Sequence, residues 1–239
     1  MAHLHLPDGV LPFYLWAAGY AVVAAVLVLL WLKFRRARNL VVFARAGFFA
    51  ALMVVAMSFY VAPLGYHLNL AALAGIVAGP AAALLACVFA NVILALLGHG
   101  GITVIGLNTV TMGAEAVGAF AVFRVATFIK TTWPRAFAAT IAALAVGTTL
   151  AFGVVALGTR DFGDVVERGR GSVTFELFDG HAHHDVHHAE ESHGDVSTGR
   201  LAALFYGLGS IGWVLEALVT ATVAAYLKRA APRLFPEAT

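Results

Sequence analysis

The chain has 239 residues, of which 61% are hydrophobic and only 12% are charged, and its mean hydropathy is +0.88. About a quarter of the residues in soluble domains are charged, so this composition excludes an ordinary soluble protein and indicates an integral membrane protein. The net charge of +2 and the pI near 8.9 fit basic cytoplasmic loops better than nucleic-acid binding. The single cysteine, Cys87, excludes both a disulfide framework and a cysteine-type metal site.

Apolar stretches long enough to cross a bilayer recur along the chain. A transmembrane helix needs about 20 predominantly apolar residues. Five stretches qualify: 13–32, 46–64, 107–123, 136–157 and 201–227. A sixth, 68–97, is too long for one ordinary span, and Gly79-Pro80 predicts a helix break inside it. The N-terminal segment has no basic region, so residues 13–32 are expected to form a retained helix rather than a signal peptide.

The distribution of basic residues predicts the number of crossings. Three short segments are basic: Lys33–Arg38, Lys130–Arg135 and Lys228–Arg233. Short basic loops stay in the cytoplasm, so an even number of spans must separate the first two. Two short crossings within 68–97, broken at Gly79-Pro80, satisfy this condition. The prediction is an all-α membrane protein of about seven transmembrane helices in a single domain (1–239), with its N-terminus outside and its C-terminus inside.

In this topology all ten histidines lie on the outer side of the membrane. His3 and His5 belong to an extracytoplasmic N-terminal tail, residues 1–12. His67 and His99 follow the second and fourth spans. The other six lie in an extracytoplasmic loop, 158–199: His181, His183, His184, His187, His188 and His193.

The outer loop contains the segment FDGHAHHDVHHAEESHGD, with six histidines and five acids among 18 residues. Such a segment cannot bury enough apolar surface to fold alone, so it is expected to be mobile. Imidazole and carboxylate both bind divalent transition metals, which favours a low-affinity collector that raises the local metal concentration. The alternative is a solvated spacer. The spacing indicates no fixed coordination geometry, so the specific site is expected elsewhere.

The N-terminal tail offers a different kind of metal site. A free α-amine, a deprotonated backbone amide and an imidazole can chelate one metal with their nitrogens in a plane, which suits Ni(II) or Cu(II) rather than tetrahedral zinc. Pro7 and Asp8-Gly9 favour a turn that returns the tail toward the outer face. His67 could then supply a fourth nitrogen. The alternative is that the terminal histidines merely lie at the water interface.

These residues resemble a known family. His5-Leu6-Pro7-Asp8-Gly9 is similar to the His-x-Pro-(Asp/Glu)-Gly motif that opens the CbiM/NikM family, the substrate-binding membrane subunits of cobalt and nickel energy-coupling-factor (ECF) transporters. The segment from Gly65 to Gly113 resembles the family further. The resemblance implies that His67 joins the N-terminal chelate, and that Gly98–Thr103 and Asn108 lie beside the metal site.

The resemblance leaves the identity of the N-terminal ligand open. Family members usually begin Met-His, whereas three residues precede Leu4-His5 here. Removal of Met1 would make Ala2-His3 a chelate, and a start at Leu4 would restore Met-His5. If Met1-Ala2-His3 stays intact, the amine, two amides and His3 could complete a plane of four nitrogens without His67. The motif spacing favours His5 over His3. His99 is expected to be a ligand, a partner that orients a ligating imidazole, or an interfacial residue with no role.

Two acids lie within predicted spans, Glu115 in the fifth and Glu216 in the seventh. A centred acid costs about 2.5–3.5 kcal/mol on the insertion scale, so each should face protein or water. Three roles stay open: a metal path, a contact with a partner subunit, or a structural role.

The sequence contains no phosphate-binding P-loop motif and no hydrolase motif, so the chain is not expected to be an enzyme. We expect the capture subunit of a nickel or cobalt importer in the cell membrane, with Ni²⁺ or Co²⁺ as cargo and no catalytic cofactor. The resemblance implies an ECF transmembrane scaffold subunit, two ATPase subunits and, in some systems, a small accessory membrane subunit as partners. The rival hypotheses are a stand-alone metal exporter and a metal-sensing membrane protein. Exporters usually place a ligand cluster at mid-membrane, and the predicted outer position of every histidine argues against one.

Overall fold

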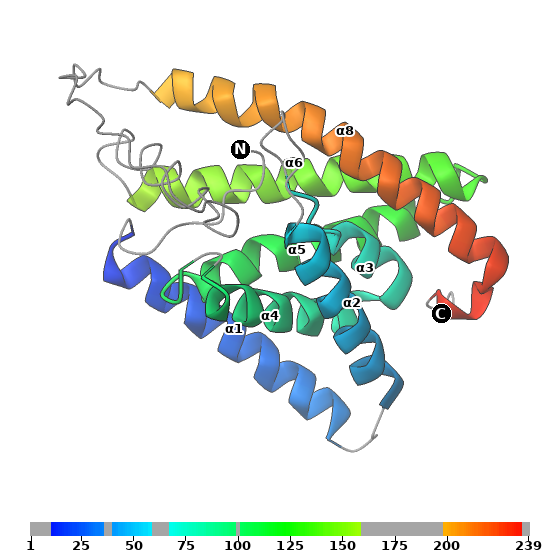
Figure 1. Cartoon of the computed structure of the whole chain (residues 1–239), viewed down its shortest axis with the longest axis horizontal. Helices are drawn as coiled ribbons and strands as arrows, with labels where there is room; N and C mark the ends of the chain where they lie inside the picture. The colour runs from blue at the N-terminus through cyan, green and yellow to red at the C-terminus, as the bar shows by residue number, and fades with distance from the viewer. Residues whose placement is uncertain (1–10, 36–39, 59–66, 99–100, 159–197, 236–239) are drawn as a thin grey trace, which may run out of the picture.

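The structure, a computed structural model, describes residues 11–35, 40–58, 67–98, 101–158 and 198–235. Within these ranges every regular element is helical, which confirms the predicted all-α fold (Figure 1). The elements are α1 (Phe13–Phe34), α2 (Leu40–Ser58), α3 (Ala71–Ala78), α4 (Pro80–Leu96), α5 (Ile105–Val125), α6 (Thr132–Gly158), α8 (Thr198–Ala230) and the short 3-10 turn η1 (Pro232–Leu234).

Five of these helices, α1, α2, α5, α6 and α8, are long and apolar enough to cross a membrane. The predicted break at Gly79-Pro80 is confirmed: α3 ends at Ala78, Gly79 has a φ of +83°, and Pro80 is the first residue of α4. Proline is favourable there because the first helical N–H has no partner within the helix. At 1.5 Å per residue, α3 is only about 12 Å long, less than half of a bilayer core. All eight of its residues are buried in the protein.

Helix α2 lies earlier in the sequence than the predicted 46–64. It begins at Leu40, so Arg45 lies inside the helix rather than before it. The Arg45 guanidinium donates a 3.3 Å hydrogen bond to the backbone carbonyl of Arg233. Long basic side chains can extend from a membrane helix to its polar end, and this explains how the helix accommodates an arginine in its first two turns.

Helix α5 lies at the centre of the bundle and packs against α1, α3, α4 and α6. Small residues permit the closest of these contacts. A Cβ atom on Gly75 of α3 would lie 1.9 Å from the carbonyl oxygen of Ala116, and one on Gly106 would lie 2.5 Å from the backbone nitrogen of Tyr20 in α1. Close approach over small residues is how membrane helices gain packing energy without a hydrophobic driving force.

Helices α6 and α8 run antiparallel beside each other (Figure 1). Trp133, near the start of α6, bonds Thr222 near the end of α8. Thr149, near the end of α6, bonds Tyr206 near the start of α8. This pair closes the bundle on the side opposite α1.

Helix ends that were predicted to share a side of the membrane do lie together. Leu11, Val104 and Val155 form one apolar cluster, and we call this the outer end of the bundle. Basic residues gather at the other end, where Arg135 bonds the carbonyls of Phe123 and Arg124 at the end of α5. We call this the inner end. The chain is a multi-pass membrane protein, while the assignment of the two ends to the two sides of the membrane stays a prediction.

Candidate metal-binding site

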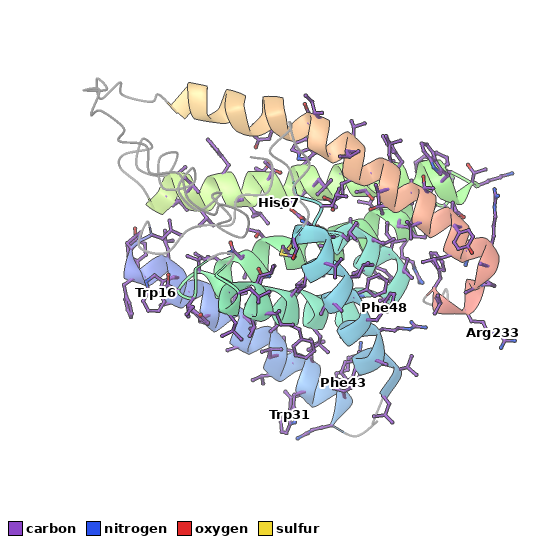
Figure 2. All side chains as sticks on the ribbon, in the orientation of Figure 1. Trp16, Trp31, Phe43, Phe48, His67 and Arg233 are labelled. Carbon is purple, nitrogen blue, oxygen red and sulfur yellow. The ribbon has the colours of Figure 1, made fainter. Side chains whose placement is uncertain are left out.

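His67 begins the short extended segment 67–70 that leads into α3, and its side chain is half-buried. Figure 2 shows His67 in the middle of the molecule, whereas Trp31 and Phe43 lie on its outside and Arg233 lies at the inner end. Trp31 and Phe43 are 62% and 48% exposed, as expected for side chains that contact lipid acyl chains.

The backbone after His67 is held by a side chain from a distant helix. The two carboxylate oxygens of Glu216, in α8, accept hydrogen bonds from the backbone nitrogens of Asn69 (3.4 Å) and Leu70 (3.2 Å). The Asn69 side chain in turn accepts a 2.7 Å bond from the backbone nitrogen of Ala71. Together these bonds satisfy N–H groups at the start of α3 that have no acceptor within the helix.

Leu70 has a left-handed backbone, with a φ of +56°, and is the one non-glycine residue with positive φ in the described ranges. This conformation costs a residue with a Cβ atom about 1–3 kcal/mol, so the surroundings must enforce it. The Leu70 side chain is 6% exposed, its nitrogen bonds Glu216, and its carbonyl accepts from Ala74. The segment is therefore held at three points.

A second buried acid supports the same segment. The Asn69 side-chain amide donates a 2.6 Å hydrogen bond to Glu115 in α5. Glu115 is 3% exposed and Glu216 is 0% exposed. Both acids therefore face protein, as the insertion cost predicts, and their burial within the chain excludes a direct contact of either with a partner subunit. Glu115 also fits against Gly147 of α6, where a Cβ atom would lie 2.1 Å from its Oε1 atom.

These contacts place His67 deeper than expected. Glu115 lies ten residues, or about 15 Å, along α5 from Ile105 at the outer end. This is about half the thickness of the hydrocarbon core. The expectation that His67 lies on an outer loop near the surface is therefore wrong, because its neighbour Asn69 is bonded to the middle of α5 and of α8. The expectation that no histidine lies at mid-depth argued against an exporter, and the position of His67 removes that argument.

Asn108 and part of the predicted glycine-rich loop lie toward the outer end. Asn108 is buried in the first turn of α5, two turns before Glu115 and on the same face. Gly98 has a φ of +76°, which favours glycine where α4 ends. The Tyr20 hydroxyl donates to the carbonyl of Ile102 and ties this loop to α1. The expected position of Asn108 beside the metal stays a prediction.

The remaining predicted ligands lie outside the residues that the structure describes. These are His3, His5, His99 and the six loop histidines, His181, His183, His184, His187, His188 and His193. Among residues 11–35, 40–58, 67–98, 101–158 and 198–235, no three His, Cys, Asp or Glu side chains are grouped closely enough to hold a metal ion. A site of three such side chains that included His67 would therefore need at least one ligand from outside these ranges.

Sequence reasoning missed Asn69. A signal was present, because asparagine just before an apolar helix is typical of residues whose side chains bond to nearby backbone N–H groups. The left-handed Leu70 had no signal, since leucine does not favour that conformation.

Comparisons with known proteins agree with this architecture. Two solved structures share the fold, one described as a transition metal transporter and the other as a truncated transition metal transporter. Each has a TM-score of 0.69 and 20% sequence identity; the matches cover 95% of this chain and 93% and 99% of the respective structures. No curated protein matches the sequence significantly. The model of the CbiM family, described as a cobalt uptake substrate-specific transmembrane region, matches residues 5–234. Because this match spans nearly the whole sequence, the chain belongs to the CbiM family.

Proposed function

We propose that this chain captures Ni²⁺ or Co²⁺ for an importer, in a planar nitrogen site built from its N-terminal segment and His67. The observation that carries the proposal is the position of His67 at mid-depth, on a backbone segment held by Asn69, Glu115 and Glu216. The CbiM family is described as a cobalt uptake region, and this supports a divalent transition metal as the cargo.

The N-terminal segment is long enough to reach this depth. Leu11 packs in the apolar cluster at the outer end, about 15 Å above the level of Glu115. An extended chain covers up to about 3.3–3.6 Å per residue, so the six residues from Leu11 back to His5 can span about 20 Å. This length would allow His5, or His3 if Met1 is removed, to reach the metal beside His67 without any movement of the helices.

The expected donors are an α-amine, a deprotonated backbone amide and two imidazoles. Such nitrogens favour planar coordination, which suits Ni(II) and tilts the proposal toward nickel over cobalt. His99 and Asn108 are proposed to lie beside the metal, where a hydrogen bond to a ligating imidazole would fix its orientation. The six loop histidines are proposed to collect metal weakly on the outer side.

The energy for uphill transport is proposed to come from partner proteins. The sequence has no P-loop, so this chain does not hydrolyse ATP by that route. We propose an ECF transmembrane scaffold subunit with two ATPase subunits, and in some systems a small accessory membrane subunit. Genes for a scaffold and ATPases next to this one would support import, whereas their absence would favour the exporter hypothesis that the depth of His67 leaves open.

The test is metal analysis of the purified chain with an untagged N-terminus, whose first residue is determined by mass spectrometry. We expect one tightly bound nickel or cobalt ion, strongly weakened binding in His67→Ala, and loss of binding when the N-terminus is acetylated. His193→Ala, in the outer loop, is the matched control and should still bind one nickel or cobalt ion tightly. An N-terminally blocked chain that still binds one ion at full affinity would overturn the planar site.

A further inference from the structure

The metal affinity of a histidine depends on how well its ring is positioned before the metal arrives. His67 lies two residues before Asn69, so its Cα lies within about 7.6 Å of the Cα of Asn69. The position of the imidazole is therefore set largely by whatever holds the backbone at residues 69 and 70.

Glu216 is suited to this task. Its two oxygens accept from two consecutive backbone nitrogens, those of Asn69 (3.4 Å) and Leu70 (3.2 Å), so one side chain holds the backbone at both residues. The acceptor comes from α8, which lies 147 residues away from Asn69 in sequence. Helix α8 is antiparallel to α6 and bonded to it at both ends, which gives the carboxylate a rigid support.

The local sequence alone does not enforce this backbone. Leucine does not favour the left-handed conformation of Leu70, and although the Asn69 side chain accepts from the nitrogen of Ala71, the N-cap residue Leu70 has no capping side chain. Glu216 supplies the acceptor for the nitrogens of Asn69 and Leu70, the second of which belongs to the residue with the left-handed backbone.

We propose that Glu216 is the positioning residue for His67: by capping α3 from another helix, its carboxylate fixes the backbone that aims the imidazole at the metal. The inference rests on the proposed function, in which His67 is a ligand. Glu216 itself touches no metal in this role and acts only through His67.

The experiment is a double-mutant cycle on the full-length, untagged chain, with Ni²⁺ as the probe. Glu216→Gln keeps the shape but replaces one acceptor oxygen with an NH₂ donor that faces a backbone N–H. We expect the Kd for Ni²⁺ to rise about 10- to 100-fold, the usual effect of losing a group that orients a metal ligand. The visible absorption band of the bound nickel should change as well.

In the His67→Ala background, adding Glu216→Gln should change the Kd by less than about twofold, because the ring that Glu216 positions is absent. Thr220→Val is the matched control. Thr220 is also fully buried in α8, one turn beyond Glu216, and its hydroxyl has no hydrogen-bond partner within the described ranges. This variant should bind Ni²⁺ as the wild type does.

Two results would overturn the inference. One is an unchanged Kd for Ni²⁺ in Glu216→Gln when His67→Ala binds more weakly than the wild type. The other is a Kd that Glu216→Gln raises by the same factor with and without His67. A wild-type Kd in His67→Ala is a different result, because it removes the proposed metal site itself. If Glu216→Gln does not accumulate as folded protein, Glu216→Asp, which keeps both acceptor oxygens but retracts them, enters the same cycle under the same criteria.

Discussion

Asn69 and Glu115 form a buried amide–carboxylate pair, in which the Asn69 Nδ2 atom donates a 2.6 Å hydrogen bond to Oε2 of Glu115. The two residues are 46 positions apart, and the bond joins the segment before α3 to the middle of α5. An acid at this depth is tolerated because protein donors replace the water that it loses.

Exchanging the members of this pair tests its contribution. Asn69→Asp replaces the donor with an oxygen that faces Glu115, so we expect the free energy of unfolding to fall by about 1–3 kcal/mol. The double variant Asn69→Asp/Glu115→Gln restores one amide and one carboxylate and should recover a large part of the loss. Thermal unfolding in detergent measures both. A double variant no more stable than Asn69→Asp would show that the pair does not act as a unit.

Gly147 of α6 provides space for Glu115, and filling that space should displace the carboxylate. A Cβ atom there would lie 2.1 Å from Oε1 and 2.2 Å from Cγ of Glu115. We expect Gly147→Ala to destabilise the protein by about 1–3 kcal/mol, as overpacking does, and to weaken metal binding through the Asn69 segment. Metal titration and thermal unfolding of the same preparation check both effects.

Gly153 provides the matched control on the same helix. A Cβ atom at this position meets nothing within 4 Å. Gly153→Ala should therefore be neutral or stabilise the protein by up to about 1 kcal/mol, because alanine favours helix more than glycine does. Equal destabilisation by the two substitutions would mean that Glu115 is not the cause.

The helices were predictable from the sequence because their signals are local. Apolar runs of about 20 residues report on burial in lipid directly, and Gly79-Pro80 breaks a helix whatever surrounds it. The predicted span 46–64 begins just after Arg45, whereas α2 begins at Leu40 and includes Arg45, whose side chain reaches the carbonyl of Arg233 from within the helix.

The depth of His67 was not predictable in the same way. The run from Leu68 onward is apolar whether it begins at the surface or in the middle of the bundle, so composition cannot locate its first residue. The depth follows from the bonds of Asn69 to Glu115 and Glu216, which join three distant parts of the chain. The acids could be identified as buried from their cost in lipid, but their partners could not.

The orientation of the two ends of the bundle can be tested by chemical labelling. The basic inner end predicts that residues 158–199 are extracytoplasmic. Ser172→Cys should react with a membrane-impermeant thiol reagent in intact cells, while the native Cys87 is buried and should not. Thr131→Cys, between α5 and α6, is the control and should react only after permeabilisation. The reverse pattern would invert the topology.

The histidines of the outer loop are expected to affect supply rather than binding geometry. Deleting 181–193 should lower metal uptake mainly when the metal is scarce. The purified deletion variant should still bind one metal ion tightly. Uptake measured across a range of metal concentrations, together with metal content, separates the two effects. If the deletion variant no longer binds one metal ion tightly, the loop is the specific site and the N-terminal segment is not.

The pH dependence of metal binding follows from the proposed donors. Imidazole and α-amine nitrogens bind a metal only when they are unprotonated, so protons compete with Ni²⁺ for the site. Because the reference pKa of histidine is about 6.5, affinity should fall progressively as the pH drops below that value, and binding near and below that pH should release the imidazole protons that the metal displaces. Replacing His67 with alanine removes one of the competing imidazoles, so the variant should bind more weakly at every pH but lose less affinity on acidification than the wild type. Calorimetric titrations in buffers of different ionisation enthalpy measure the protons released. A wild-type Kd that is constant between about pH 5 and 8 would exclude imidazole ligation.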